Sequence, residues 1–142
     1  GILKPNEEEG LFTSILPHLL VDGVKEAVCA SRAKVCFVLN LMTKPGETDA
    51  FSASDYLEKL LYYLGDKKRL DYMIVNNSCL AREVVDVYKS LGQEVVKIDE
   101  KKCKILAPKA KIVKVKLTQY LEKEHLLQHD SDNLVKAILS LS

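Results

Sequence analysis

The sequence has no Cys-x-x-Cys pair, no very long apolar run and no excess of one charge sign. Its longest apolar runs fall well short of the ~20 residues that a membrane span requires. The formal net charge of +1 gives no general reason to expect nucleic acid or an acidic membrane as a partner. The scattered cysteines argue against a structural zinc site and favour reduced, structural thiols. They are Cys29, Cys36, Cys79 and Cys103.

The start of the chain lacks the pattern of a secretory signal, because residues 1–10 are polar and hold three consecutive glutamates. We therefore expect a cytoplasmic protein. The chain has 142 residues, of which 47% are hydrophobic and 29% charged, as in an ordinary globular domain. This length is sufficient for one domain with its own core.

The lysine-rich segment 101–116 lacks arginine and aromatic residues. Nucleic-acid surfaces use arginine and interleaved aromatic rings for stacking, so this segment does not predict one. Lysines that alternate with Ile112, Val113 and Val115 are typical of an edge strand that discourages pairing with other molecules. We therefore expect a hairpin-like region with an edge strand here.

Apolar patterning predicts strands that alternate with helices. Residues 35–39 form a continuous apolar run, which is typical of a central parallel strand covered on both faces. Residues 72–75 and 94–98 predict two further strands. Ser52 and Asp55 match a capping box before a leucine stripe that Gly65 ends. This order favours an α/β, Rossmann-like three-layer sandwich, with a mostly parallel sheet and helices on both faces. The strands are too few for a complete domain of that kind.

Four other segments carry helical spacing. Leu11, Ile15, Leu16, Leu19 and Leu20 line the first; Asp22 caps the second over Val24, Ala27 and Val28; Val84, Val85, Tyr88 and Leu91 line the third before Gly92; Asp130 or Ser131 caps the last over Leu134, Val135 and Ile138.

The segment that follows the first strand, residues 40–49, is dense in functional groups. Ligands of open α/β sheets lie beyond the carboxyl ends of such strands. A Pro45-Gly46 turn with positive φ at the glycine would direct the polar side chains across that crevice. These are Asn40, Thr43, Glu47, Thr48 and Asp49. A structural alternative stays open, in which the threonine and aspartate side chains only bond their own backbone.

Two motifs together carry a resemblance to a known family. Residues 11–21, Leu-Phe-Thr-Ser-Ile-Leu-Pro-His-Leu-Leu-Val, resemble a segment of the bacterial gluconeogenesis-factor family, which is related to the CofD-like phospholactate transferases. Residues 40–49 with 53–55 resemble that family's second motif. Residues 72–76 and 84–92 are similar to a third portion, and Gln128-His129-Asp130 stands where the family has Arg-His-Asp.

The resemblance implies that residues 1–142 are the carboxyl-terminal part of a CofD-like α/β domain. It implies a cytoplasmic regulator that binds a UDP-sugar such as UDP-N-acetylglucosamine and is required for growth on gluconeogenic carbon sources, cell shape and wall integrity. No catalytic residue is assigned. The ligand-binding residues indicated by the motifs are Gly10, Thr13, Ser14, Asn40, Thr43, Glu47, Thr48, Asp49, Tyr88 and Gln128.

Roles for these residues follow from chemistry and from the resemblance. Thr13 and Ser14 stand at a helix entrance, where N–H groups favour a diphosphate, although capping that helix is their structural alternative. Glu47 or Asp49 could act as a base, hold Mg²⁺ or accept bonds from sugar hydroxyls. Core packing is the simpler role for Tyr88, whereas the resemblance places it near the ligand.

Some features depart from the family pattern. Glutamates precede Gly10 where the family has a Gly-Pro-Gly-Ser turn, and the glycine-rich nucleotide loop of its amino-terminal half is missing. Gln128 stands in place of the family's arginine, so it keeps hydrogen bonding but loses a charge-assisted, forked grip on phosphate; if that arginine holds a diphosphate, affinity here should be weaker. Two alternatives stay open: a CofD-like transferase of a phospholactate-type group that uses Mg²⁺, and a unit that only folds or dimerises, so that a homo-oligomer is also open.

Overall fold

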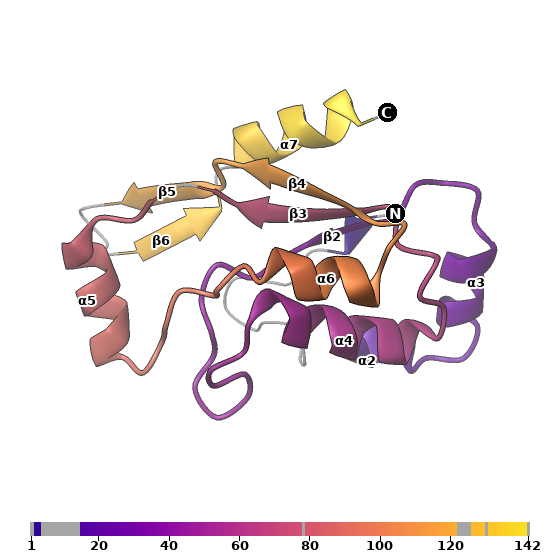
Figure 1. The fold of residues 1–142 in the computed structure, drawn as a ribbon, viewed down its shortest axis with the longest axis horizontal. Helices are drawn as coiled ribbons and strands as arrows, with labels where there is room; N and C mark the ends of the chain where they lie inside the picture. The colour runs from indigo at the N-terminus through magenta and orange to yellow at the C-terminus, as the bar shows by residue number, and fades with distance from the viewer. Residues whose placement is uncertain (1, 4–14, 78, 122–125, 130, 142) are drawn as a thin grey trace.

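The computed structural model describes residues 2–3, 15–77, 79–121, 126–129 and 131–141. Four parallel strands form its main sheet in the order β1-β2-β3-β4, and two antiparallel strands form a separate hairpin (Figure 1). The strands of the sheet are β1 (Ile2–Leu3), β2 (Cys36–Val38), β3 (Tyr72–Asn76) and β4 (Lys111–Val115), and those of the hairpin are β5 (Thr118–Leu121) and β6 (Leu126–His129).

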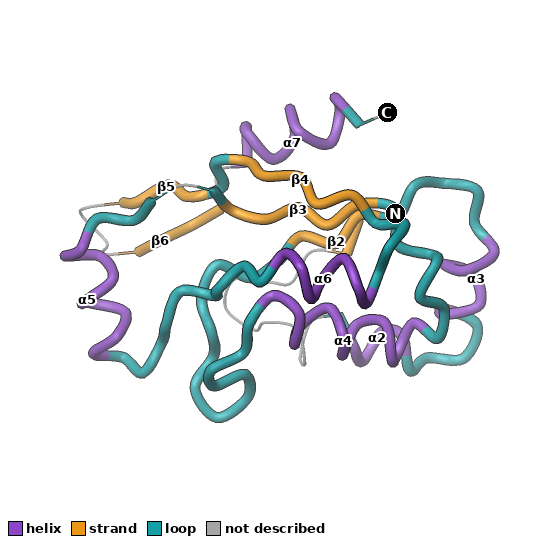
Figure 2. The backbone as a smooth tube through the Cα atoms, in the orientation of Figure 1, coloured by secondary structure: helices purple, strands orange, loops and turns teal. Residues whose placement is uncertain are grey.

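Helices cover both faces of the sheet, so the predicted three-layer arrangement is confirmed (Figure 2). α7 (Ser131–Ser140) lies over one face. α2 (Leu16–Leu19), α4 (Ala53–Leu64) and α6 (Glu100–Leu106) lie under the other. α3 (Val24–Ala30) lies beside the amino ends of the strands, and α5 (Arg82–Ser90) lies beyond their carboxyl ends.

Two apolar clusters lie on the two faces of the sheet because side chains of a strand alternate in direction. Phe37 and Met73 point into the larger cluster with the leucines of α4, whereas Val38 and Ile74 point toward Leu134 of α7. Every residue from Val35 to Leu39 is buried. The prediction of a central strand covered on both faces is therefore confirmed.

Local signals set the limits of α4 as the sequence predicts. Ser52 and Asp55 form the capping box, and Gly65 ends the helix with a left-handed backbone at φ 80°. The leucine stripe packs inward, and Leu60 and Leu64 have no exposed surface. The predicted strand at residues 72–75 is confirmed as β3, which extends through Asn76, and the predicted edge strand is confirmed as β4 at the end of the sheet.

The predicted strand at residues 94–98 is wrong. This segment makes one isolated antiparallel bridge, from Val95 to Met42, and takes no place in the sheet. β4 occupies the position beside β3, and α6 takes up residues that we expected in the lysine-rich hairpin. The helix escaped recognition because its inward side is small: Cys103 is buried, but Ile105 is 78% exposed.

Smaller corrections concern helix caps and faces. Asp22 does not cap α3, because the N-cap is Gly23, which has no side chain and a φ of 87°. Ala27, Leu20 and Val135 are exposed although we placed them on buried faces. Leu20 follows the last residue of α2, and Ala27 and Val135 lie on the exposed sides of α3 and α7.

Among the described residues, no helix is long and apolar enough to span a membrane.

Candidate functional site

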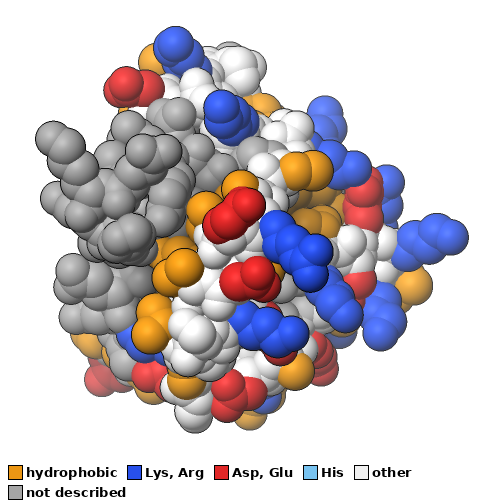
Figure 3. Space-filling view, turned by 90° about the vertical axis from the view of Figure 1, so that its left-hand side faces the viewer, with side chains coloured by type: hydrophobic (Ala, Val, Ile, Leu, Met, Phe, Trp, Pro, Cys, Tyr) orange, Lys and Arg blue, Asp and Glu red, His pale blue; other side chains and the backbone are white. Residues whose placement is uncertain are grey.

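Polar residues gather at the edge of the sheet where its parallel strands end. The arrows of β2, β3 and β4 point to the same side of the molecule, and α5 and the loop after β2 lie there (Figure 1). Asn40 follows β2, Asn76 ends β3, and Asn77 comes next. This is the edge at which open α/β sheets bind ligands. Figure 3 faces this edge and shows both charge signs interspersed with apolar side chains outside the grey atoms.

The predicted ligand loop begins against the segment 94–96. Thr43 N–H donates to the Glu94 carbonyl at 2.8 Å, and Glu94 N–H donates back to Thr43 Oγ1 at 2.9 Å. Val96 N–H donates to the Leu41 carbonyl at 3.1 Å. The hydroxyl oxygen of Thr43 thus accepts a bond inside the protein, and the residue is 2% exposed. A ligand contact by Thr43 stays a prediction.

Thr48 joins the middle of the loop to α4. Its Oγ1 accepts bonds from Lys44 N–H and from the Tyr56 hydroxyl, both at 2.8 Å, and Thr48 is 1% exposed. Burial raises the pKa of Tyr56 and outweighs the hydrogen bond to Thr48, which would lower that pKa. The phenol therefore stays protonated and can donate its hydrogen. In the structure, the Thr48 side chain therefore stabilises its own loop by accepting hydrogen bonds from the loop backbone and from α4.

Replacing Thr48 with valine should therefore lower stability. The change keeps the shape but leaves Lys44 N–H and the Tyr56 hydroxyl without their acceptor, which costs ~1–3 kcal/mol of unfolding free energy. Urea denaturation measures this loss. Tyr56→Phe is the matched control, because it removes only the donor hydroxyl and should cost ~1 kcal/mol. Equal losses for the two variants would contradict the role of Thr48 as a double acceptor.

The tip of the loop presents the acidic side chains to solvent. Gly46 has a φ of 78°, so the predicted Pro-Gly turn with positive φ is confirmed. Gly46 N–H donates to Asp49 Oδ2 at 2.9 Å, and both Glu47 and Asp49 are exposed. Asp49 thus bonds the backbone of its own loop, which is the structural role that the sequence left open. Its second carboxylate oxygen and the Glu47 side chain face the solvent.

Asn40 differs from its neighbours because its side-chain oxygen is buried and unpaired. Among the residues that the structure describes, Asn40 Oδ1 is the buried side-chain oxygen or nitrogen without a hydrogen-bond partner. A buried acceptor of this kind is costly, and native structures seldom keep one without a use. It lies one residue beyond the buried run of β2, at the ligand-binding edge.

Tyr88 belongs to α5, which lies beyond the carboxyl ends of the strands. It is 8% exposed and packs with Val84 against Leu41, Met42 and Leu80 in a small apolar cluster. The packing role that its helical spacing predicts is confirmed. The cluster places α5 against the start of the ligand loop.

The structure does not describe the side chains of four predicted site residues. Gly10, Thr13 and Ser14 fall outside the described residues, so their predicted contacts with the ligand stay predictions. Gln128 lies in β6 opposite Gln119, and only its backbone position is described.

Sequence reasoning missed a polar cluster at the end of the loop. Asp99 Oδ1 accepts a bond from Ser54 N–H at 2.8 Å, and Asp99 Oδ2 accepts from the Ser52 hydroxyl at 3.0 Å and from the Ser54 hydroxyl. Burial alone would raise the pKa of Asp99, but these bonds outweigh it and hold that pKa below its usual value. The stabilisation is thus present above the unfolded pKa and is lost as pH falls through the folded one. Recognising α6 would have revealed Asp99 as the residue before a helix.

A metal site is not formed by the described residues alone. They contain no group of three or more His, Cys, Asp or Glu side chains that could hold an ion. Mg²⁺ often takes only one or two carboxylates together with phosphate and water. Glu47 and the free oxygen of Asp49 are the carboxylate groups at the loop tip that face outward.

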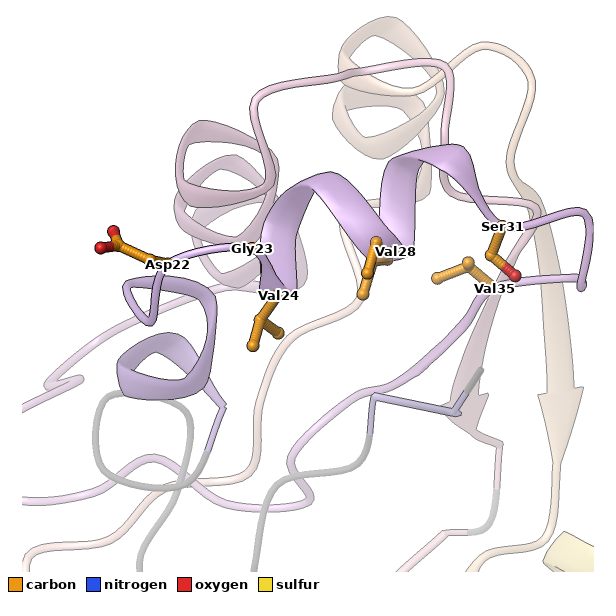
Figure 4. A pocket seen from close by; sticks show the side chains of 7 residues that line it. Asp22, Gly23, Val24, Val28, Ser31 and Val35 are labelled. Atoms are coloured by element: carbon orange, nitrogen blue, oxygen red, sulfur yellow. The ribbon is translucent and has the colours of Figure 1, made fainter.

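The apolar hollow beside α3 is not at this edge. It has a volume of about 600 Å³, and Val24, Val28 and Val35 line it together with Ser31 (Figure 4). Val35 precedes β2, so the hollow lies at the amino ends of the strands. Asp22 points away from the other labelled side chains. The hollow therefore lies at the opposite end of the sheet from Asn40.

Comparison with known proteins gives the chain relatives. The family described as 2-phospho-L-lactate transferase CofD matches residues 10–118. A gluconeogenesis factor of Halalkalibacterium halodurans is 34% identical over 91% of this chain and 38% of its own length. One of Bacillus subtilis is 28% identical over 92% of this chain and 40% of its own length. The chain spans less than half the length of these curated relatives.

Solved structures agree with the sequence matches. A Bacillus halodurans protein of the UPF0052 family superimposes with a TM-score of 0.85 and 30% identity, over 97% of this chain and 43% of that protein. A second crystal structure of the same Bacillus halodurans protein gives the same TM-score of 0.85, and this chain covers 42% of it.

Proposed function

The chain belongs to the CofD family, and from that membership we propose that it is the part of a gluconeogenesis factor that binds a UDP-sugar without transforming it. The ligand would lie beyond the carboxyl ends of β2 and β3. The observation that carries this proposal is Asn40 Oδ1, a buried acceptor without a partner at that edge. A uracil N–H or a sugar hydroxyl is a donor of the required kind.

The loop tip supports a ligand that carries hydroxyl groups. Glu47 and Asp49 are exposed carboxylates, and carboxylates accept strong bonds from hydroxyls. They would also repel a diphosphate, so the phosphates would lie away from the loop tip. Growth on gluconeogenic carbon sources is the role that the relatives' name suggests, and the roles in cell shape and wall integrity rest on the family resemblance.

A CofD-like transferase is the second candidate, because the matching family takes its description from such an enzyme. Phosphoryl-group chemistry depends on cations that stabilise the developing charge. Lys44 is the basic residue in the segment 40–51. This shortage of positive charge favours binding over transfer.

Calorimetric titration with UDP-N-acetylglucosamine tests the proposal. The chain and the full-length Bacillus subtilis relative should both be titrated, with and without Mg²⁺. Heat of binding with no product in the recovered ligand supports a binding protein. Product formation with a deazaflavin acceptor supports the transferase. Binding by the full-length relative but not by this chain means that this part only folds or dimerises. Absence of binding in both proteins refutes the UDP-sugar assignment.

Gln128→Arg should tighten UDP-sugar binding. An arginine forks two charge-assisted bonds onto a phosphate, which the glutamine amide does not do, so we expect a gain of ~1–2 kcal/mol, or about tenfold in Kd. Calorimetry at constant ionic strength measures the change. Gln119→Arg, at the paired position of the same hairpin, is the control for added charge alone. Equal tightening by both variants would mean that charge, not position, is responsible.

A further inference from the structure

The Asp99 carboxylate bonds across to another helix. Asp99 is the residue before α6, yet its side chain makes no capping bond to α6. It accepts instead from Ser54 N–H at 2.8 Å and from the Ser52 hydroxyl at 3.0 Å, at the start of α4. Ala53 N–H also donates to the Lys97 carbonyl at 2.8 Å. The first turn of α4 is thereby fixed to residues 97–99.

The residues just before 97–99 contact the amino-terminal end of the ligand loop. Residues 94 and 96 pair with Thr43 and Leu41, as described above. Just before them, Gln93 Nε2 donates to the Thr43 carbonyl at 3.4 Å. A side-chain carbon added at Gly92 would lie 3.4 Å from Pro45 Cγ, so the backbone passes close to the loop turn. Residues 92–99 therefore form a support along both ends of the segment 44–51.

We propose that Asp99 is a positioning residue, which fixes the carboxyl-terminal end of the loop 44–51 so that Glu47 and Asp49 are held toward the ligand. The effect on binding rests on the proposed function, whereas the effect on the loop does not. Asp99 is not one of the predicted ligand-binding residues; it acts through its bonds to Ser52 and Ser54.

A carboxylate fits this position because donors converge on both of its oxygens, and the Cys103 thiol adds a weaker contact to Oδ1 at 3.9 Å. The Ser52 hydroxyl also lies 3.0 Å from Asp55 Oδ2. Both of its oxygens are in use, and one of them accepts from two hydroxyls. An asparagine would offer one acceptor oxygen and place an amide N–H₂ toward donors. The lowered pKa of Asp99 agrees with an ionised acceptor at neutral pH.

The chain offers a matched control at the opposite end of the sheet. Asp71 Oδ2 accepts from Val35 N–H at 2.8 Å and from Arg69 Nη1 at 3.0 Å. This is also a half-buried carboxylate that joins distant segments, but it lies at the amino ends of β2 and β3. Asp71→Asn should therefore lower stability without reaching the loop.

Hydrogen–deuterium exchange of the free protein tests the positioning itself. In Asp99→Asn, the amides of residues 44–51 should exchange at least tenfold faster than in the wild type, and in Asp71→Asn they should keep the wild-type rate once the change in global stability is subtracted. Loop exchange that is equal in the two variants overturns the proposal. If Asp99→Asn does not fold, Ser54→Ala, which removes one of the donors, should still accelerate the loop amides about threefold, and unchanged amides overturn the proposal there.

Titration with UDP-N-acetylglucosamine then tests the link to binding. We expect at least fivefold weaker binding for Asp99→Asn and unchanged binding for Asp71→Asn. Faster loop exchange with wild-type affinity would overturn the link between the loop and the ligand. Faster loop exchange in a protein that binds no UDP-sugar at all would refute the proposed function and leave the positioning role in place.

Discussion

Asn40→Leu should weaken UDP-sugar binding at least tenfold and leave the folded protein as stable as before, or more stable. The leucine has nearly the same volume but no oxygen, so a ligand donor at this position would lose its partner. A lost hydrogen bond from a desolvated group costs ~1–3 kcal/mol, which corresponds to about tenfold or more in affinity. Stability should not fall, because the free protein loses a buried acceptor that has no partner.

Calorimetry and urea denaturation on the same preparations measure the two effects. Asn77→Leu is the control, since Asn77 also lies at the carboxyl end of a strand but is exposed. Its stability should change by less than ~0.5 kcal/mol, so the comparison separates the loss of a buried acceptor from the effect of a new leucine at this edge. A loss of stability in Asn40→Leu with unchanged affinity would show that the Asn40 side chain supports the fold and not the ligand.

Phe37→Ala should give the largest loss of stability. Phe37 lies in the central strand β2, has no exposed surface and packs among the leucines of α4 in the larger core cluster. Removing a buried phenyl ring leaves a cavity, which costs ~3–5 kcal/mol of unfolding free energy. This is a large part of the ~5–15 kcal/mol that a domain has in total. The midpoint of urea denaturation should therefore fall sharply.

Val95→Ala provides the comparison for a residue of the wrongly predicted strand. Val95 is 39% exposed and makes the isolated bridge to Met42, so its truncation should cost ~1 kcal/mol or less. A loss of the same size in both variants would contradict the assignment of Phe37 to the core and of Val95 to the periphery.

Elements with their own start and stop signals were predicted correctly. α4 has its capping box, its leucine stripe and Gly65, all within one stretch of sequence. β2 has a run that is apolar on both faces, which few other elements tolerate. The segments 94–98 and 100–106 lack such signals. The first has two adjacent valines but no strand partner in the sheet, and the second is a helix with few buried residues.

The candidate site was likewise predictable from the sequence only in part. Its location after β2 and the Pro45-Gly46 turn follow from local sequence, because strand ends and glycine backbone angles are local properties. The inward direction of the Thr43 and Thr48 hydroxyls does not. Their partners, Glu94 and Tyr56, are fixed by how the loop folds against its neighbours.

Residue patterns alone identify an α/β chain of the CofD family, with a buried parallel strand that leads into a polar loop. Apolar periodicity and helix caps act over a few residues, so they can be read without coordinates. The three-dimensional packing was needed to show that Asn40 Oδ1 is unpaired and that Asp99 accepts a bond from Ser54, 45 residues away in sequence. Such pairings depend on which segments pack side by side, and no pattern within either segment specifies the other.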